Sequence, residues 1–148
     1  CGSRLVRALY WRKETIMPTF LDELNKKFIY KKDREQYSHR DAWHIMKREP
    51  YYGDCEDYAL TLLYNLKDRS ILKFLFSLII RESKIIYCKS PRGIGHVILK
   101  YKGRYIDNIQ KEWTTRGALK ADGYKLSAWL YIPYQVVIKL IFGLFKTR

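Results

Sequence analysis

The stretch Tyr52-Gly53-Asp54-Cys55-Glu56-Asp57-Tyr58-Ala59-Leu60 decides the fold, because it turns a loop into an amphipathic helix with a cysteine at its start. Asp54 is a favoured N-cap residue, and Asp57 three positions later completes a shortened capping box. The residues that recur at helical spacing on one face are Cys55, Ala59, Leu62, Leu63 and Leu66. The pattern therefore predicts a helix that begins at Asp54 and holds Cys55 in its first turn.

The segments around this helix predict an α+β domain. Residues 4–48 favour helices, one starting at Thr19 and a second over residues 38–48, and a loop over residues 51–53 then leads to Cys55. An apolar helix and several strands are expected downstream, over residues 70–80, 84–88, 96–101, 104–109 and 124–132. Helices first and antiparallel strands after them are typical of the α+β class. Because no repeat or Gly/Ser linker interrupts the chain, we expect one domain over residues 1–148.

The composition is that of a basic globular protein. Lys and Arg total 29 against 15 Asp and Glu, a net charge of +14. Such an excess favours an anionic partner, which would be an acidic protein, a membrane surface or nucleic acid. The basic residues are spread along the chain without a nucleic-acid-binding motif, so a basic solvated surface is the simpler interpretation. The three Cys residues lack C-x-x-C spacing, which argues against a zinc site and a disulfide framework and fits a free thiol.

Two apolar runs, residues 71–80 and 136–145, are each about ten residues long, whereas a membrane-spanning helix needs roughly 20. No transmembrane span is therefore expected. The second run ends in a basic tail, which suits either a membrane surface or, the preferred interpretation, a core element packed on the sheet. No signal peptide is visible, so a cytoplasmic location, in a host cell or virion, is favoured over a periplasmic one.

Two further reactive residues, His96 and Asp107, lie on the predicted hairpin. With a two-residue turn at Lys102-Gly103, Tyr101 faces Arg104, and His96 and Asp107 become diagonal neighbours on one face of the sheet. Their backbones would then be roughly 7–8 Å apart, which the two side chains can bridge. A register slip of one residue would place them on opposite faces.

Cys55, His96 and Asp107 have the residue types of a nucleophile, a base and an orienting group. A helix N-terminus and an imidazolium stabilise a thiolate, and the Cys55 backbone N–H supplies one oxyanion donor. Candidates for the second donor or a substrate contact are His44, Tyr51 and Tyr52. The chemistry predicted is that of a cysteine peptidase acting on a protein substrate through a thioester acyl-enzyme, with no cofactor required.

Two alternatives stay open at this point. An amine in place of water would make the same acyl-enzyme an acyltransferase of the transglutaminase type. A basic binding module for nucleic acid or a membrane is the alternative outside enzymes, and the intact Cys, His and Asp set argues against it. The acidic residues Asp54, Glu56 and Asp57 either cap the helix or form a calcium site, since calcium prefers oxygen ligands.

Three motifs together resemble those of the bacterial transglutaminase-like cysteine peptidases: Gly53-Asp54-Cys55-Glu56-Asp57-Tyr58-Ala59, Gly95-His96-Val97 and Ile106-Asp107-Asn108. The resemblance implies a papain-like fold, with the helix that carries the Cys packed on an antiparallel sheet. It assigns Cys55 as nucleophile, His96 as base and Asp107 as orienter. In the adhesin-releasing periplasmic type, acidic residues beside the Cys bind calcium, which implies Asp54, Glu56 and Asp57 here. Small proteins of this type also occur in bacteriophage genomes, and the compact chain suits such an origin.

Overall fold

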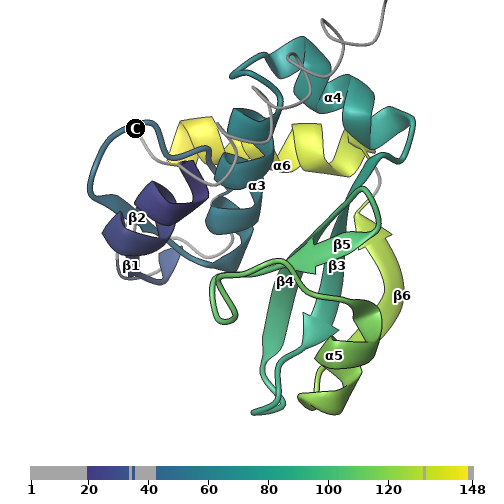
Figure 1. The fold of residues 1–148 in the computed structure, drawn as a ribbon. Coiled ribbons are helices and arrows are strands. Elements are labelled where there is room, and N and C mark those ends of the chain that lie inside the picture. Colours follow the sequence, from purple (N-terminus) through teal and green to yellow (C-terminus); the bar gives the residue numbers. More distant parts are fainter. Residues whose placement is uncertain (1–19, 34, 36–42, 132, 147–148) are drawn as a thin grey trace, which may run out of the picture.

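The computed structural model describes residues 20–33, 35, 43–131 and 133–146 (Figure 1). A helix over residues 20–27 comes first. The elements that follow are β1 (Phe28–Tyr30), β2 (Tyr51–Gly53), α3 (Cys55–Leu66), α4 (Ile71–Ile79), β3 (Ser83–Lys89), β4 (Gly95–Tyr101), β5 (Arg104–Ile106), α5 (Arg116–Ala121), β6 (Lys125–Tyr131) and α6 (Pro133–Lys146). The mixture of helices and an antiparallel sheet confirms the α+β class. The expected helix start at Thr19 lies outside the described residues.

The main sheet has the strand order β5-β4-β3-β6, and all neighbouring strands are antiparallel. The predicted hairpin register is confirmed, because Tyr101 pairs with Arg104 and Leu99 pairs with Ile106. Lys102 and Gly103 have φ angles of 47° and 80°, the left-handed conformations that a two-residue hairpin turn requires. β5 is shorter than expected and ends at Ile106, so Asp107 begins the next turn.

Different helices cover the two faces of the sheet. Side chains alternate between the faces along a strand, so Val97 and Leu99 pack with α3 in one buried cluster. Ile98 faces the other way and packs with Leu119 of α5 in a second cluster. His96 has the same parity as Ile98 and therefore belongs to the second face.

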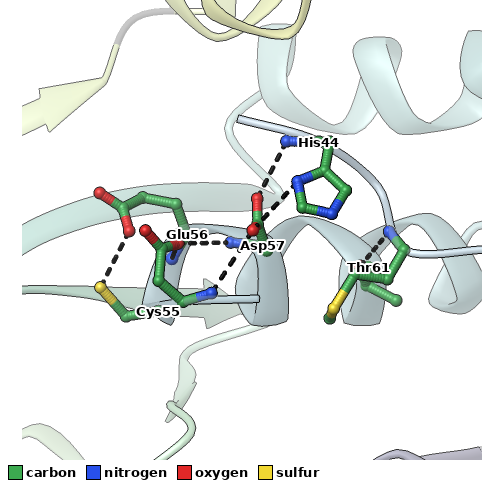
Figure 2. A network of polar contacts seen from close by, with 7 residues as sticks. His44, Cys55, Glu56, Asp57 and Thr61 are labelled. Atoms are coloured by element: carbon green, nitrogen blue, oxygen red, sulfur yellow. Dashed lines mark hydrogen bonds and ion pairs between the residues drawn. The ribbon is translucent and has the colours of Figure 1, made fainter. Parts of the chain in front are cut away.

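The helix expected over residues 38–48 is wrong for its described part, because residues 43–47 have no regular secondary structure. Side chains of α3 bind the backbone N–H groups that a helix would use internally. The N–H of His44 donates to Oδ1 of Asp57 at 2.9 Å, and that of Met46 donates to Oγ1 of Thr61 at 2.9 Å (Figure 2). The loop expected over residues 51–53 is also wrong, since this segment is β2, which pairs in parallel with β1.

The two apolar runs form α4 and α6, which contact each other. Ser70 caps α4 as the predicted apolar helix begins. α6 contributes Val136 to the core, and its Gly143 lies so close to Trp43 that a Cβ would meet the Trp43 carbonyl oxygen at 1.7 Å. The expectation of a core element is confirmed by Val136, and the contacts of α6 also include α4 and the chain around Trp43. No helix in the described part of the chain has the length and apolar content that crossing a bilayer needs.

Candidate thiol active site

His96 and Asp107 form a buried pair where β4 starts and β5 has ended. His96 Nε2 lies 2.7 Å from Oδ2 of Asp107, and the two side chains are 6% and 1% exposed. The Asp107 carboxylate accepts two further hydrogen bonds. The backbone N–H of Gln110 donates to Oδ1 at 2.7 Å, and the Tyr124 hydroxyl donates to Oδ2 at 2.9 Å. The carboxylate of Asp107 is therefore fixed from three directions.

These donors determine the charge of Asp107. Burial alone would raise the pKa of its carboxyl group, but the hydrogen bonds from His96 and Gln110, with help from Tyr124, outweigh burial and lower the pKa. Asp107 is thus ionised and accepts the Nε2–H of His96. This fixes the tautomer of the imidazole and leaves Nδ1 as the basic nitrogen. Among the described residues, Nδ1 has no hydrogen-bond partner.

Cys55 is the first residue of α3, and its helix start is capped by the side chain of Asp54. Oδ1 of Asp54 accepts the backbone N–H groups of Glu56 at 3.2 Å and Asp57 at 3.4 Å, and Asp57 completes the predicted capping box. The thiol of Cys55 donates to Oε2 of Glu56 at 3.0 Å (Figure 2). The helix start therefore places Cys55 where the sequence predicts it. The thiol is engaged in the hydrogen bond to Glu56.

The surroundings of Cys55 oppose its ionisation. Burial raises the pKa of the thiol, and the negative charges of Glu56 and Asp54 raise it further. The backbone N–H of Val97 acts in the opposite direction, which places the sulfur beside the residue that follows His96. In the described structure the thiol hydrogen-bonds to Glu56 and not to His96. The structure therefore joins His96 to Asp107 and brings Cys55 to the same strand, without a Cys–His hydrogen bond.

The acidic residues near Cys55 form two groups whose candidate ligand atoms lie within 4.8 Å of one another: Asp54 with Cys55 and Glu56, and Asp33 with Asp54 and Asp57. Burial, followed by the influence of Glu56, raises the pKa of Asp54 to about 8. Burial also raises the pKa of Asp57 to about 6, although His44 opposes the shift. Crowded, partly desolvated carboxylates of this kind stabilise one another poorly unless a proton or cation is present.

The candidate oxyanion donors of the sequence lie at different places. The ring of His44 faces Asp57, with Nδ1 3.1 Å from Oδ2 (Figure 2). Tyr52 is exposed and lies under the ammonium group of Lys31, which is 5.9 Å from the ring centre. Tyr51 is buried in the core. A different residue, Tyr30 of β1, has its pKa raised to about 12 by burial and then by the charges of Cys55, Asp54 and Glu56, so it lies within electrostatic range of this helix start.

Sequence reasoning missed three residues of this neighbourhood: Tyr30, Asp33 and Tyr124. Tyr30 pairs with Gly53 through the parallel contact between β1 and β2, a long-range pairing with no local sequence signal. Asp33 follows the same strand. Tyr124 stands directly before β6 and is buried. A buried Tyr hydroxyl needs a polar partner, so the predicted strand could have indicated that Tyr124 contacts a polar residue of the sheet.

Comparisons with known proteins agree with this fold. No protein-family model matches the sequence, and no curated protein sequence matches it. Among solved structures, Legionella pneumophila LapG is similar, with a TM-score of 0.50 and 18% sequence identity over 78% of this chain and 68% of that chain. LapG is a periplasmic cysteine protease of the transglutaminase-like family. The likeness concerns the fold, and it is consistent with the expected papain-like architecture.

The expected cellular location needs correction. The sequence favoured a cytoplasmic over a periplasmic location, and the similar structure contradicts this preference, because LapG is a periplasmic protease.

Proposed function

We propose that this protein is a cysteine peptidase that cleaves a protein substrate through a thioester acyl-enzyme, with Cys55 as nucleophile, His96 as base and Asp107 as orienting group. The observation that carries the proposal is the buried contact of 2.7 Å between Asp107 and His96, which stands at the start of β4, the strand on which α3 packs. The similarity in fold to a cysteine protease supports it.

In this proposal each residue has one task. Nδ1 of His96 removes the thiol proton as Cys55 attacks the substrate carbonyl carbon, and the resulting imidazolium later protonates the leaving amine. Water then hydrolyses the thioester, with His96 again acting as base. Asp107 holds the ring tautomer and stabilises the imidazolium. The N–H of Cys55 and the Tyr30 hydroxyl, which is within electrostatic range of Cys55, are the candidate donors to the oxyanion.

The hydrogen bond between the Cys55 thiol and Glu56 must break before this chemistry begins. In the described structure the Glu56 carboxylate holds the Sγ–H and raises the pKa of Cys55. A side-chain rotation of Glu56 would free the sulfur, and the His96 ring, which points to the sheet face opposite α3, must turn about the start of β4 to meet it. We therefore propose that the described arrangement is the resting form.

Calcium is part of the proposal as an optional ligand, not a participant in bond breaking. The carboxylate oxygens of Asp33, Asp54 and Asp57 suit the ligand preference of calcium. Because these carboxyl groups lie close together, a bound calcium ion would neutralise their combined negative charge. When bound, the ion would supply positive charge beside Cys55, which favours the thiolate. Asp54 already caps α3 through Oδ1, and Asp57 already binds His44 and the Asp54 N–H, so calcium would share these oxygens with their present partners. Glu56 belongs to the neighbouring group that contains the thiol.

Two finer alternatives need an experiment. An amine acceptor would turn the same acyl-enzyme into an acyltransferase, and a binding module with this fold would need no thiol at all. The test is incubation of the protein with a peptide library in buffer with and without hydroxylamine, which traps acyl-enzymes as hydroxamates. Peptide cleavage by the wild type that is lost in Cys55→Ala and His96→Ala supports the peptidase. Hydroxamates without hydrolysis would indicate acyl transfer, and activity that survives Cys55→Ala would overturn the proposal.

A further inference from the structure

α6 presents an apolar side to solvent. Its exposed large side chains recur at helical spacing on one face and are Tyr134, Ile138, Ile141, Phe142 and Phe145. The opposite side contributes the buried Val136 and Gly143. A surface helix normally directs its apolar face to the core and its polar face to water. α6 keeps apolar residues such as Val136 and Leu140 on its core side and exposes a second apolar face to solvent.

α4 repeats the feature next to α6. Leu72, Phe76 and Ile79 stand at i, i+4 and i+7 and are 77%, 61% and 64% exposed, while Phe74 and Leu78 are buried on the other side. The two helices contact each other, and in Figure 1 α4 lies beyond the C-terminal end of α3 while α6 passes across α3. We call the exposed faces of these helices the α4–α6 surface. Apolar exposure of this extent is typical of an interaction site.

The charges around this surface indicate the chemistry of its partner. The sequences of α4 and α6 contain three Lys residues, Lys73, Lys139 and Lys146, and no Asp or Glu. Arg81 follows α4, and the whole chain carries a net charge of +14. A second copy of the chain would bring charges of the same sign together across a symmetric contact, which opposes self-association. An anionic partner complements both the apolar side chains and the basic residues.

We propose that the α4–α6 surface docks the protein peripherally on an anionic phospholipid bilayer. Its side chains protrude, as the 77% exposure of Leu72 and the 73% exposure of Phe145 show, and protruding apolar groups suit insertion between headgroups. The exposed Lys73, which pairs with Asp68, and the exposed Arg81 after α4 then meet the anionic headgroups, whereas Lys139 lies over the ring of Trp43.

The test is flotation of the full chain with vesicles of phosphatidylcholine alone or with about one third phosphatidylglycerol. The surface variant is Phe76→Ser/Phe142→Ser/Phe145→Ser. Its matched control is Ile94→Ser/Ile109→Ser, which removes equally exposed apolar side chains from loops elsewhere. The wild type and the control are expected to float with the anionic vesicles, and the surface variant to lose about tenfold in partitioning. Unfolding in urea checks that both variants remain folded, and Leu72→Ser/Ile138→Ser replaces the surface variant if it does not.

Three results would overturn this proposal. The wild type would fail to bind anionic vesicles, or the surface variant would bind as well as the control. Alternatively, sedimentation without lipid would show a dimer that only the surface variant dissociates, which would assign the surface to a second copy. None of these outcomes depends on peptidase activity, because the Cys55→Ala protein serves equally well in the measurement.

Discussion

The hydroxyl group of Tyr124 donates a hydrogen bond of 2.9 Å to Oδ2 of Asp107, the carboxylate oxygen that His96 also contacts. The rings of Tyr124 and His96 have centroids 6.3 Å apart. Tyr124 is thus the outermost member of a buried chain of contacts that runs through Asp107 to His96. We assign it a positioning role, since it acts on the base through the carboxylate.

Tyr124→Phe is predicted to keep the packing and lose this donor. A hydrogen bond to a charged group contributes about 1.5–3 kcal/mol, so peptidase activity should fall about tenfold or more. Because the Tyr124 hydroxyl helps to lower the pKa of Asp107, its loss raises that pKa, and the acidic limb of the pH profile should move to higher pH. Tyr105→Phe on the same buried face is the control. An unchanged pH profile in Tyr124→Phe would contradict the positioning role.

Glu56→Gln is predicted to make Cys55 more reactive. The substitution removes the negative charge that raises the pKa of the thiol while keeping the size of the side chain. Alkylation of Cys55 by iodoacetamide near neutral pH should accelerate at least about threefold, because a larger fraction is thiolate. Glu82→Gln removes a carboxylate that pairs with Lys67 and serves as the control. A slower or equal rate in Glu56→Gln would show that Glu56 does not restrain the thiol.

Asp54→Asn is predicted to flatten the pH dependence of stability. The pKa of Asp54 is raised from its ordinary value of 3.8 to about 8 in the folded protein, so the folded state binds more protons than the unfolded state between these values. Stability must therefore fall as the pH rises through this window. Asn also caps helices well, so Asp54→Asn removes the titration and keeps the cap.

Free energies of unfolding in urea at about pH 6 and about pH 8 measure the effect, since Asp57, with a pKa of about 6, contributes mainly below this range. The wild type should lose more stability between these pH values than Asp54→Asn. Asp22→Asn, at an exposed position of the first described helix, is the control. Equal losses in wild type and Asp54→Asn would refute a raised pKa for Asp54.

Gly143→Ala is predicted to destabilise the protein by about 1–3 kcal/mol, the usual effect of an inserted methyl group where none fits. The new Cβ would stand 1.7 Å from the carbonyl oxygen of Trp43, so α6 would have to move. Gly117→Ala in α5 meets no atom closer than 4.0 Å and should be neutral or stabilising, because Ala favours helices. Urea unfolding compares the two variants. Equal effects would indicate that α6 does not pack on Trp43 as described.

The parts of the fold that the sequence predicts well depend on short-range patterns. The helical spacing after Cys55 and the capping residues predict α3, and the turn at Lys102-Gly103 predicts the hairpin register. That register also predicts the shared face of His96 and Asp107, which the contact of 2.7 Å reflects. These features need no knowledge of distant parts of the chain.

The missed parts depend on long-range contacts. The segment from Trp43 to Lys47 is not helical, because Asp57 and Thr61 of α3 bind its backbone. β2 forms only because Phe28 and its neighbours pair with it in parallel. The outward apolar face of α6 also escapes prediction, since periodicity defines an apolar stripe without showing which way it points.

The most direct test of the thiol active site is the alkylation rate of Cys55 in native wild type and His96→Ala near neutral pH with calcium present, with the site assigned by mass spectrometry. The buried Cys88 is the internal reference. If His96 activates the thiol, Cys55 should react faster than Cys88, and its rate should fall at least about tenfold in His96→Ala. Equal Cys55 rates in the two proteins would contradict a catalytic pair of Cys55 and His96.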